Sequence, residues 1–599
     1  MVTSLSAIPH DSASKWVSGP IGIAAAILHT TSQSREQVQP HRSADGRLAA
    51  VFAGYLLNPK ELSDDLAAKG YEPRNRSDVA IALAAYEAWG EACANRLEGE
   101  FALIVADRRC EKLFIARDHI GVVPLYYIEE PGRLVVASDM RTLHALSRVP
   151  LEPDPIYLAQ MMANKWFAKD ATPWRQIKRV ARASTLTFDG HRLSQARYWE
   201  PPTDITIRYK NDRDYVEHYR DILFDSLSRT SRSDAQVGVA VSGGLDSSAL
   251  FCVADRLEKE GRWQAPDFVG YSLAADEDGN AFELPYARAA AKHVGRDLIE
   301  VPLFDPDLEW YTSDAQWHRD IPTPSNGAMM LDMEQRVVND GGRVLINGSG
   351  GDEWLQGNQQ YYREFVADLD FARFAQALGR DAKAMGLGAA VKIALRQSVA
   401  EITPDPLRRL VQKRLRAWRR KNQRELVWLN HELRAALAKA EESYMATIPD
   451  RSVEMVKHNL LKSPRQDLSH GLMRRQRAKI GLESRHPMQT KAFVEFSLCT
   501  PDYIKRQGGV RKVAHRSAMA GILPQEVIDR TSKANFTNVQ IDMQFADFAR
   551  KYAKERLGQF CDFDGLEEVL GVDYSTPEGD YWCWEIWGLY ASAAFLYQD

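Results

Sequence analysis

The fold of this chain is decided by one stretch, Val237-Gly238-Val239-Ala240-Val241-Ser242-Gly243-Gly244-Leu245-Asp246-Ser247-Ser248, in which an apolar, β-branched run ends in glycines and serines. A helical pattern from Ala249 to Leu257 follows directly, so the stretch predicts a strand, a tight turn and a helix. The two glycines let the backbone turn sharply with its amides exposed, and the helix N-terminus adds partial positive charge behind them. This turn suits a pyrophosphate group, and Asp246 is placed to hold the Mg²⁺ that accompanies such a group.

The spacing of this turn differs from the Walker pattern, which needs four residues between its glycines and a Lys before Ser or Thr. It resembles instead the pyrophosphate-binding loop of the ATP pyrophosphatases, enzymes that split ATP into AMP and pyrophosphate. The resemblance implies ATP and Mg²⁺ as cofactors. It also implies nucleotide contacts from Val241, Ser242, Gly243, Gly244, Asp246, Ser247 and Ser248.

Composition narrows the class of protein. With 599 residues the chain is long enough for two or three domains, and its net charge of -4 gives no general attraction to nucleic acid or to a membrane surface. The six cysteines contain no CxxC pair, which favours a reducing cytoplasm and argues against structural zinc. The longest N-terminal apolar run, 21–28, is too short to span a bilayer. We therefore expect a cytoplasmic enzyme without membrane or nucleic-acid partners.

The first part of the chain has the pattern of a layered α/β domain. Strand-like runs at 48–54, 101–105 and 112–116 accompany a helical pattern at 79–89. Four segments resemble the glutaminase domain of asparagine synthetases: Trp89-Gly90, Leu97-Glu98-Gly99-Glu100-Phe101-Ala102, Ala116-Arg117-Asp118-His119-Ile120-Gly121 and Pro124-Leu125-Tyr126-Tyr127. The resemblance implies an αββα sandwich of the N-terminal-nucleophile hydrolase class over residues 1–205.

Several residues of this domain depart from the glutaminase pattern. A glutaminase of this class needs a Cys immediately after the initiator Met, and Val2 stands there. The family's Asn-Gly-Glu segment corresponds to Ala53-Gly54-Tyr55, and of its acidic pair Asp78 remains while Ala80 replaces the Glu. We therefore expect an inactive, structural relic that does not hydrolyse glutamine.

The second part of the chain, 206–599, begins after a turn-rich segment at 199–204. Strands expected at 268–273 and 343–347 alternate with helices, which predicts a doubly wound parallel sheet whose ligand crevice lies at the carboxyl ends of its strands. Asp246 and Asp352 both follow such strands. The resemblance to the synthetases implies that both hold Mg²⁺ and that Asn347 and Gly348 contact the nucleotide.

Two later segments extend the resemblance. Arg475 and the run from Gly481 to Pro487, which includes Glu483, resemble a conserved arginine-, glutamate- and proline-containing segment of the family. Leu523-Pro524 and the run Arg530–Phe536, which includes Lys533, resemble its C-terminal element, although Arg530 lies one residue further from the Lys than usual. The resemblance implies catalytic roles for Lys533, Arg475 and Glu483. In the family the Lys stabilises the negative charge of the acyl-adenylate and of the tetrahedral state.

Other positions separate this chain from asparagine synthesis. Ser349 stands where asparagine synthetases carry a Glu that handles ammonia and where β-lactam synthetases carry a Tyr, which points to a substrate that brings its own amine. A helical insert is expected at about 360–450. Within it, nine basic residues and no acidic one lie between Arg408 and Arg424, interleaved with apolar residues at helical spacing. That segment fits either a solvated face of a core helix or a docking surface for an acidic peptide or partner protein.

Four hypotheses follow. The favoured one is an ATP-dependent amide-bond-forming synthetase that resembles lasso-peptide macrolactam synthetases: it adenylates a side-chain carboxylate of a precursor peptide, whose own N-terminal amine then attacks. This resemblance implies a leader-peptide protease or recognition protein as partner. The alternative is an asparagine synthetase-like or β-lactam synthetase-like ligase acting on a small amino acid. The net negative charge of the chain argues against an enzyme that acts on tRNA. The retained Asp246, Asp352 and Lys533 argue against a binding module without catalytic activity.

Overall fold

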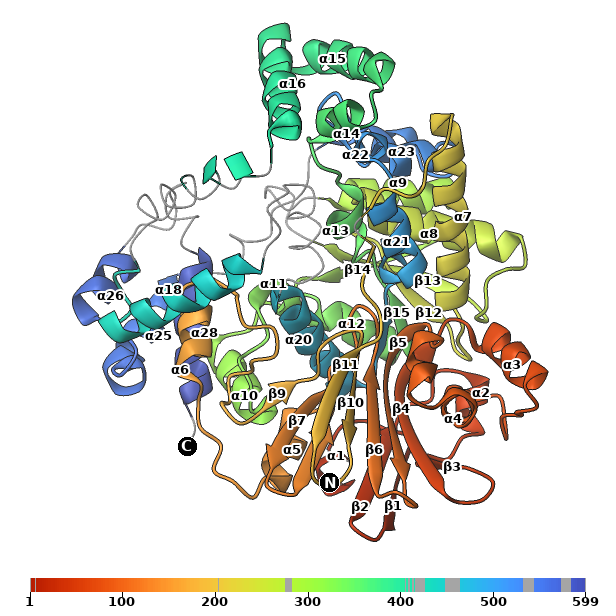
Figure 1. Ribbon diagram of the computed structural model, residues 1–599, viewed down its shortest axis with the longest axis vertical. Coiled ribbons are helices and arrows are strands. Elements are labelled where there is room, and N and C mark those ends of the chain that lie inside the picture. Colours follow the sequence, from red (N-terminus) through yellow and green to blue (C-terminus); the bar gives the residue numbers. More distant parts are fainter. Residues whose placement is uncertain are drawn as a thin grey trace.

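The computed structural model describes residues 2–5, 7–202, 204–274, 283–404, 406–407, 410–411, 414, 426–447, 464–531, 543–571 and 583–597. Figure 1 shows antiparallel strands of the N-terminal part at the bottom of the molecule and the central parallel strands directly above them. Among the residues described, no helix is both long and apolar enough to cross a membrane.

The N-terminal part is built on a six-stranded antiparallel sheet in the order β11-β10-β6-β5-β4-β3. Its strands are β3 (His41–Arg42), β4 (Leu48–Leu56), β5 (Gly99–Asp107), β6 (Lys112–Arg117), β10 (Ser184–Phe188) and β11 (Leu193–Arg197). The apolar runs expected to be strands at 48–54, 101–105 and 112–116 form β4, β5 and β6, because their β-branched and aromatic residues fill both faces of a covered sheet.

Both faces of this sheet are covered. On one face, α3 (Pro59–Ala68) and α4 (Asp78–Trp89) bury Leu62 and Ile81 in the same apolar cluster as Phe114 of β6. On the other face lies a second layer of strands: β1 (Ser12–Ser18), β2 (Ile21–Ile27), β7 (Tyr126–Glu130), β8 (Arg133–Ala137) and β9 (Lys178–Arg179). Helix α5 (Met140–Leu146) contacts β7 and β8, so the layers run helix, strand, strand, helix.

The second part is built on a five-stranded parallel sheet in the order β14-β13-β12-β15-β16. Its strands are β12 (Val237–Ala240), β13 (Phe268–Ala274), β14 (Leu298–Pro302), β15 (Val344–Ile346) and β16 (Glu483–Arg485). In the register, Val237 lies opposite Phe268 on one side and Val344 on the other. The carboxyl ends of β12 and β15 are therefore neighbours, which is where a parallel sheet holds its ligand.

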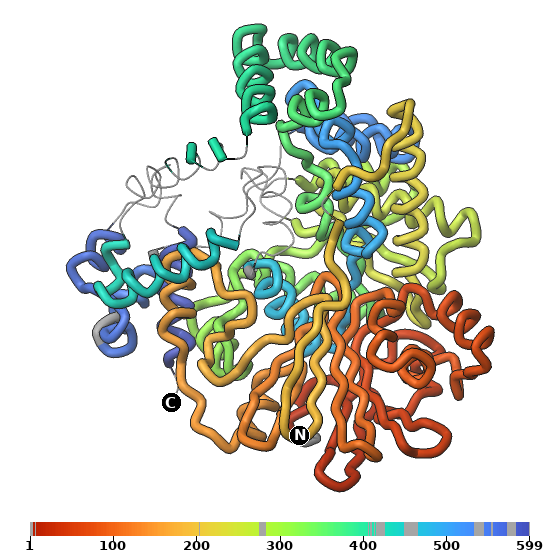
Figure 2. The backbone as a smooth tube through the Cα atoms, viewed as in Figure 1, coloured from red at the N-terminus to blue at the C-terminus, as the bar shows by residue number. Residues whose placement is uncertain are grey.

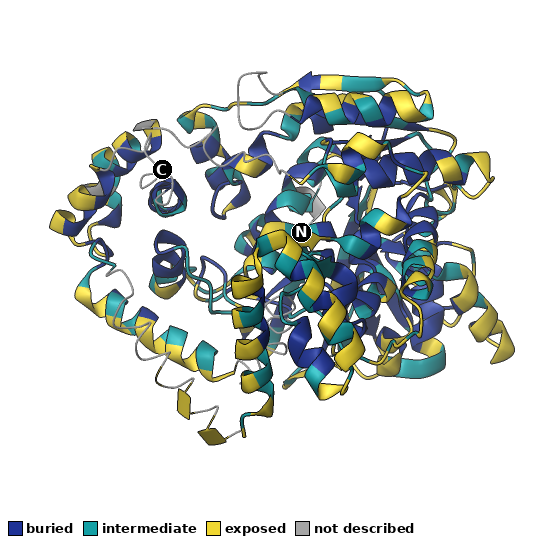
Figure 3. Ribbon diagram, turned by 90° about the horizontal axis from the view of Figure 1, so that it is seen from above, coloured by how far each residue is buried: buried dark blue, intermediate teal, exposed yellow. Residues whose placement is uncertain are grey.

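Helices cover both faces of the parallel sheet. Helices α7 (Asp212–Thr230), α8 (Leu245–Lys259) and α9 (Leu284–Val294) share one core cluster with β12 and β15. Helix α12 (Leu331–Asn339) packs on the other face, and α20 (Pro464–Ile480) contacts it and leads into β16. Figure 3 shows buried residues concentrated inside these layers and exposed residues on outer helix faces.

Two helical groups lie outside the sheets (Figure 2). One is formed by α14 (Tyr361–Ala367), α15 (Phe371–Met385) and α16 (Leu387–Ile402). The other joins α6 (Pro155–Met162), α18 (His431–Ala446), α25 (Met543–Tyr552), α26 (Phe563–Leu570) and α28 (Cys583–Leu596) in one large apolar cluster. Most of the basic segment 408–424 lies outside the described residues.

Candidate active site

The loop between β12 and α8 has a conformation that requires glycine. Gly243 has a φ of +81°, and a Cβ at this position would lie 2.3 Å from the carbonyl oxygen of Glu283. Only glycine tolerates both the positive φ and this close approach. The loop 241–244 therefore turns tightly from the strand into α8, whose N-terminus carries the partial positive charge of the helix dipole.

Serine side chains hold this loop in shape. The hydroxyl of Ser247 accepts a hydrogen bond from the amide of Ser242 at 3.0 Å, and the hydroxyl of Ser242 accepts one from the amide of Gly244 at 3.2 Å. Val241 and Ser248 are buried, at 1% and 0% exposure, so they support the loop from beneath. Seven residues of this loop are predicted to contact the nucleotide. Because the side chains of Val241 and Ser248 are buried, these two residues could contact it mainly through their backbone atoms.

A second loop, between β15 and the short helix α13 (Gly351–Leu355), closes against the first. The side chain of Asn347 accepts a hydrogen bond from the amide of Ser349 at 3.0 Å. A Cβ on Gly348 would lie 3.1 Å from the amide nitrogen of Ser247, and one on Gly351 would lie 2.3 Å from Cγ of Asp246. The structure thus brings the predicted residues Asn347, Gly348 and Asp352 together with the glycine-rich loop.

Lys512 joins the two predicted metal carboxylates. Its Nζ forms an ion pair with Asp246 and lies 2.7 Å from Oδ1 of Asp352. The lysine side chain is 11% exposed and comes from the residue that precedes α23 (Val513–Ala518). One ammonium group therefore contacts two carboxylates that are 106 residues apart in sequence. Asp246 and Asp352 lie close together because they follow neighbouring parallel strands.

The electrostatics of this cluster follow from burial and charge. Burial by itself would lower the pKa of Lys512, but attraction to Asp246 and Asp352 outweighs burial and raises that pKa. His515 lies on the same helix, with Nε2 3.5 Å from Oδ1 of Asp246. Burial, assisted by the charge of Lys512, lowers the pKa of His515 to about 3, so its imidazole is neutral at physiological pH.

The donor set fits Mg²⁺. This ion prefers one or two carboxylates together with substrate phosphates and water. Asp246 and Asp352 are close enough to share a single cation, as their common contact with Lys512 shows. Two carboxylates leave most of the octahedral positions of Mg²⁺ open, and the phosphates of a nucleotide and water would fill them.

Arg530, from the C-terminal part of the chain, holds the glycine-rich loop in place. Its Nη2 lies 2.7 Å from Oε1 of Glu283, and its Nη1 donates to the carbonyl of Gly243 at 3.2 Å. Its guanidinium also stacks over the ring of Tyr286 at 4.4 Å. Arg530 therefore contacts the glycine-rich loop, although in the sequence it lies one residue further from Lys533 than the family pattern has it. Lys533, the predicted catalytic lysine, lies outside the described residues.

A cavity of about 400 Å³ opens beside the second loop. It is lined by Ser349 and Glu353 and by Arg465, Arg474 and Arg477 of α20. Arg474 and Arg477 pair with Glu483 and Glu334, but arginine has five N–H donors, so one partner does not exhaust it. Nη1 of Arg474 and Oε1 of Gln489, also in the lining, are buried without a hydrogen-bond partner among the described residues. This lining suits a polar, acidic ligand.

The structure does not bring Arg475 to the two metal carboxylates. Its Nη1 lies 2.6 Å from Oδ2 of Asp320 and its Nη2 lies 3.5 Å from Oδ2 of Asp314, both buried. These contacts tie α20 to α10 (Leu308–His318), which carries Asp314, and to the segment after it, which carries Asp320. The adjacent arginines, Arg474 and Arg477, are the ones that line the cavity beside Ser349.

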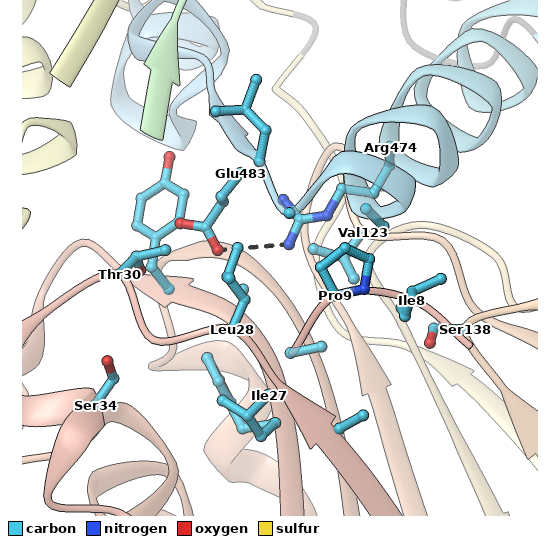
Figure 4. Close-up of a pocket in the computed structure, with 18 of the residues that line it drawn as sticks. Ile8, Pro9, Ile27, Leu28, Thr30, Ser34, Val123, Ser138, Arg474 and Glu483 are labelled. Atoms are coloured by element: carbon cyan, nitrogen blue, oxygen red, sulfur yellow. Dashed lines mark ion pairs between the residues drawn. The ribbon is translucent and has the colours of Figure 1, made fainter. Parts of the chain in front are cut away.

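Glu483 lies on β16 opposite Val344, two residues before β15 ends at Ile346. Burial would raise the pKa of Glu483, but Arg485 and Arg474 outweigh burial and lower it, so this carboxylate is an ionised anchor. Figure 4 shows Glu483 paired with Arg474 on the wall of a second cavity, of about 180 Å³. Like Arg475, Glu483 is therefore placed away from Asp246 and Asp352.

That second cavity is lined by residues whose sequence positions resemble those of a glutaminase's glutamine pocket. Its lining includes Ala53, Gly54, Tyr55 and Asp78, the residues that correspond to the glutamine pocket, together with Ile8 and Leu28. Oδ2 of Asp78 accepts hydrogen bonds from the amide of Leu56 at 2.9 Å and from Arg232 at 2.7 Å. The one acidic residue retained from that pocket thus links the N-terminal part to the segment after α7.

Sequence reasoning missed Lys512, His515 and the loop contact of Arg530. No local pattern marks Lys512, which stands among other basic residues in Arg511-Lys512-Val513-Ala514-His515-Arg516. The only available signal is its position shortly before Leu523-Pro524, the start of the C-terminal segment that was recognised.

Comparison with known families agrees with this site. A glycine-rich loop beside two carboxylates, at the carboxyl ends of parallel strands, is an arrangement that suits a nucleotide and its metal ion. The family described as asparagine synthase matches residues 218–593, and the glutamine amidotransferase domain matches residues 1–199. Because the first match covers well over half of the chain, the protein belongs to the asparagine synthase family, a family of ATP-dependent carbon–nitrogen ligases.

Individual relatives are distant. Amidase chyE of Penicillium rubens is 27% identical over 65% of this chain, and asparagine synthetase [glutamine-hydrolyzing] 1 of Bacillus subtilis is 25% identical over 82%. Amidase chry2 of Gibberella zeae is 26% identical over 61%. The chain spans 60% of chyE, 76% of the synthetase and 56% of chry2. Glutamine phosphoribosylpyrophosphate amidotransferase of B. subtilis, compared by structure, is 16% identical over 39% of this chain and 48% of its own, with a low TM-score of 0.21.

Proposed function

We propose that this protein uses ATP to form an amide bond: it adenylates a carboxylate bound beside Ser349 and joins it to an amine carried by the same peptide. The observation that supports this most directly is the cluster of Asp246, Asp352 and Lys512 at the end of the glycine-rich loop. The loop that carries Asp352 also lines the polar cavity through Ser349 and Glu353, which supports an acceptor site next to the nucleotide.

In the proposed reaction, the glycine-rich loop and the N-terminus of α8 bind the pyrophosphate part of ATP. An oxygen of the acceptor carboxylate attacks the α-phosphorus, and pyrophosphate leaves. When bound to Asp246 and Asp352, Mg²⁺ neutralises phosphate charge. Lys512 presents a fixed positive charge to the same phosphates, and Arg530 holds the loop against Glu283. The amine then attacks the acyl carbon, AMP leaves, and the amine loses a proton.

The acceptor is proposed to be an acidic side chain of a peptide, in a macrolactam synthesis of the lasso type. Three features support a substrate that brings its own amine. Val2 stands where the glutaminase nucleophile belongs, Asp78 is held by Arg232, and Ser349 replaces the residue that handles ammonia. The cavity of about 400 Å³ is also within the roughly 300–1,000 Å³ range of sites that hold drug-sized ligands.

A second candidate is a ligase for a small amino acid. It is favoured by the similarity to the B. subtilis asparagine synthetase, which covers more of this chain than the similarity to either amidase. The names of the other two relatives, amidase chyE and amidase chry2, do not distinguish between a peptide and a small amino acid as the acceptor. A leader-peptide protease or recognition protein as partner belongs to the peptide hypothesis alone.

ATP–pyrophosphate exchange distinguishes the two candidates. The protein is incubated with labelled pyrophosphate and either a peptide with one Asp or Glu and a free N-terminus, its N-acetylated form, or free aspartate. We expect exchange with both peptides and loss of one water from the free-amine peptide only, since the acetylated form has no nucleophile. Exchange with aspartate alone would favour the small-molecule ligase. Exchange with none of them, or equal exchange by Asp246→Ala, would contradict the proposed adenylation.

A further inference from the structure

Helices α15 and α16 form an arm that projects from the synthetase part (Figure 1). They are joined at Gly386, whose φ is +87°, and they pack on α14 through buried small residues that include Ala377 and Ala394. Tyr361 and Tyr362 of α14 lie in the same apolar cluster and are buried. The arm is therefore a packed element of defined shape.

The outer face of α16 carries an exposed aliphatic stripe. Leu387, Leu395, Val399 and Ile402 are 64%, 60%, 57% and 70% exposed. Their spacings of eight, four and three residues place them on one side of the helix. Single exposed apolar residues need no explanation, but a contiguous stripe of them on a folded protein marks an interaction site.

The charges around this stripe have one sign. Lys392 and Arg396 of α16 and Lys383 of α15 are exposed. The acidic residues in the sequence of the two helices are Asp381 and Glu401, and both contact side chains of α14. Asp381 is buried and accepts hydrogen bonds from the hydroxyls of both α14 tyrosines, and Glu401 lies 3.0 Å from Arg363 of α14.

We propose that the outer face of the α15–α16 arm is a docking surface for an acidic amphipathic helical segment of a partner polypeptide. Such a segment would pack its own leucine-type side chains on the stripe, as in helix-in-groove recognition, and place its carboxylates beside Lys383, Lys392 and Arg396. The proposal does not depend on which acceptor the synthetase uses.

Charge and packing favour this occupant over two others. A second copy of the arm would bring like charges together, because the exposed charges beside the stripe are positive. A helix that lies in a membrane surface keeps a broad polar face in water, whereas α16 is packed on α14 along the side that carries Ala394. An acidic helix would not be repelled by the positive charges and would not need α16 to leave α14.

The test uses the full-length protein and a fluorescent synthetic helix with leucines at helical spacing on one face and glutamates on the other. A peptide of the same composition in scrambled order is its control. We expect fluorescence anisotropy to report binding of the amphipathic peptide that weakens as salt is added, since exposed charges are screened within about 8–10 Å at physiological ionic strength.

Two variants locate the surface. The first variant, Leu395→Ser with Val399→Ser, removes two apolar side chains of the stripe. The second, Lys392→Glu with Arg396→Glu, reverses the charge beside the stripe. Each should weaken binding by roughly tenfold or more, the loss expected when central interface side chains are removed. The matched control is Val17→Ser with Val38→Ser, which are 67% and 69% exposed in the N-terminal part and should leave affinity unchanged. Circular dichroism melts confirm that all variants are folded.

Several results would overturn the proposal. These are no binding of the amphipathic peptide, equal binding of the scrambled peptide, and undiminished binding by the two arm variants. Stripe-dependent binding to phosphatidylglycerol vesicles without peptide binding would assign the arm to a membrane surface instead. A dimer in sedimentation that the Leu395→Ser, Val399→Ser variant abolishes, again without peptide binding, would assign it to a second copy of the chain.

Discussion

Replacing Lys512 by Met tests whether one cation holds the two carboxylates of the candidate metal site. Methionine keeps most of the length and the apolar stem of lysine but removes the ammonium group. Asp246 and Asp352, with side chains 14% and 35% exposed, would then lie close together without that shared cation. We expect a folded but less stable protein that has lost most of its activity.

The size of the stability loss follows from burial. Removing one partner of a fully buried ion pair costs about 3–5 kcal/mol, whereas exposed pairs contribute about 0–1 kcal/mol. Lys512 is nearly buried while Asp352 is partly solvated, so the free energy of unfolding should fall by about 1–3 kcal/mol at pH 7. Adenylation should fall by roughly 100- to 1,000-fold, as when one electrostatic group is removed from a charged transition state.

The pH dependence has a defined sign. The pKa of Lys512 is raised in the folded state, so its stabilisation is fully present below the unfolded value of about 10.4 and is lost only as the pH rises through the folded value. The difference between wild type and Lys512→Met should therefore be steady from pH 6 to 9.

Urea unfolding at several pH values, with and without Mg²⁺ and a non-hydrolysable ATP analogue, measures the stability loss, and pyrophosphate exchange measures adenylation. The matched control is Lys259→Met, because Lys259 pairs with Asp255 at 2.7 Å on the same domain but is 62% exposed. Its unfolding free energy should change by only about 0.5 kcal/mol. A Lys512→Met variant as stable and active as that control would refute the reasoning.

Three further predictions concern the same chemistry. Asp246→Ala and Asp352→Ala should each reduce pyrophosphate release by at least roughly 100-fold while the protein stays folded; near-normal release in the presence of Mg²⁺ would place the metal site elsewhere. Lys533→Ala should impair single-turnover amide formation far more than equilibrium binding of an ATP analogue, and the reverse result would reassign Lys533 to nucleotide binding. Glutamine hydrolysis should be absent because Val2 replaces the nucleophile and Arg232 holds Asp78; glutamate release that is blocked by thiol alkylation would contradict this.

Short-range pattern was enough to predict the framework of the site. The strand, turn and helix over residues 237–257 follow from β-branched residues, two glycines and a helical apolar repeat, all of which act between neighbours in sequence. The proximity of Asp246 and Asp352 also follows, because each lies in the first turn of the helix that comes after a strand, and a parallel sheet aligns the carboxyl ends of these two strands.

Contacts between distant segments were decided by the tertiary structure alone. Lys512 lies 266 residues from Asp246 and Arg530 lies 287 residues from Gly243, and nothing local in the sequence relates these positions. The same holds for α20, where only packing separates Arg475, which pairs with Asp320, from Arg474 and Arg477, which line the cavity beside Ser349. A sequence motif gives the type and order of charged side chains. Which partner each one meets depends on the direction in which the folded backbone points it, and long-range packing sets that direction.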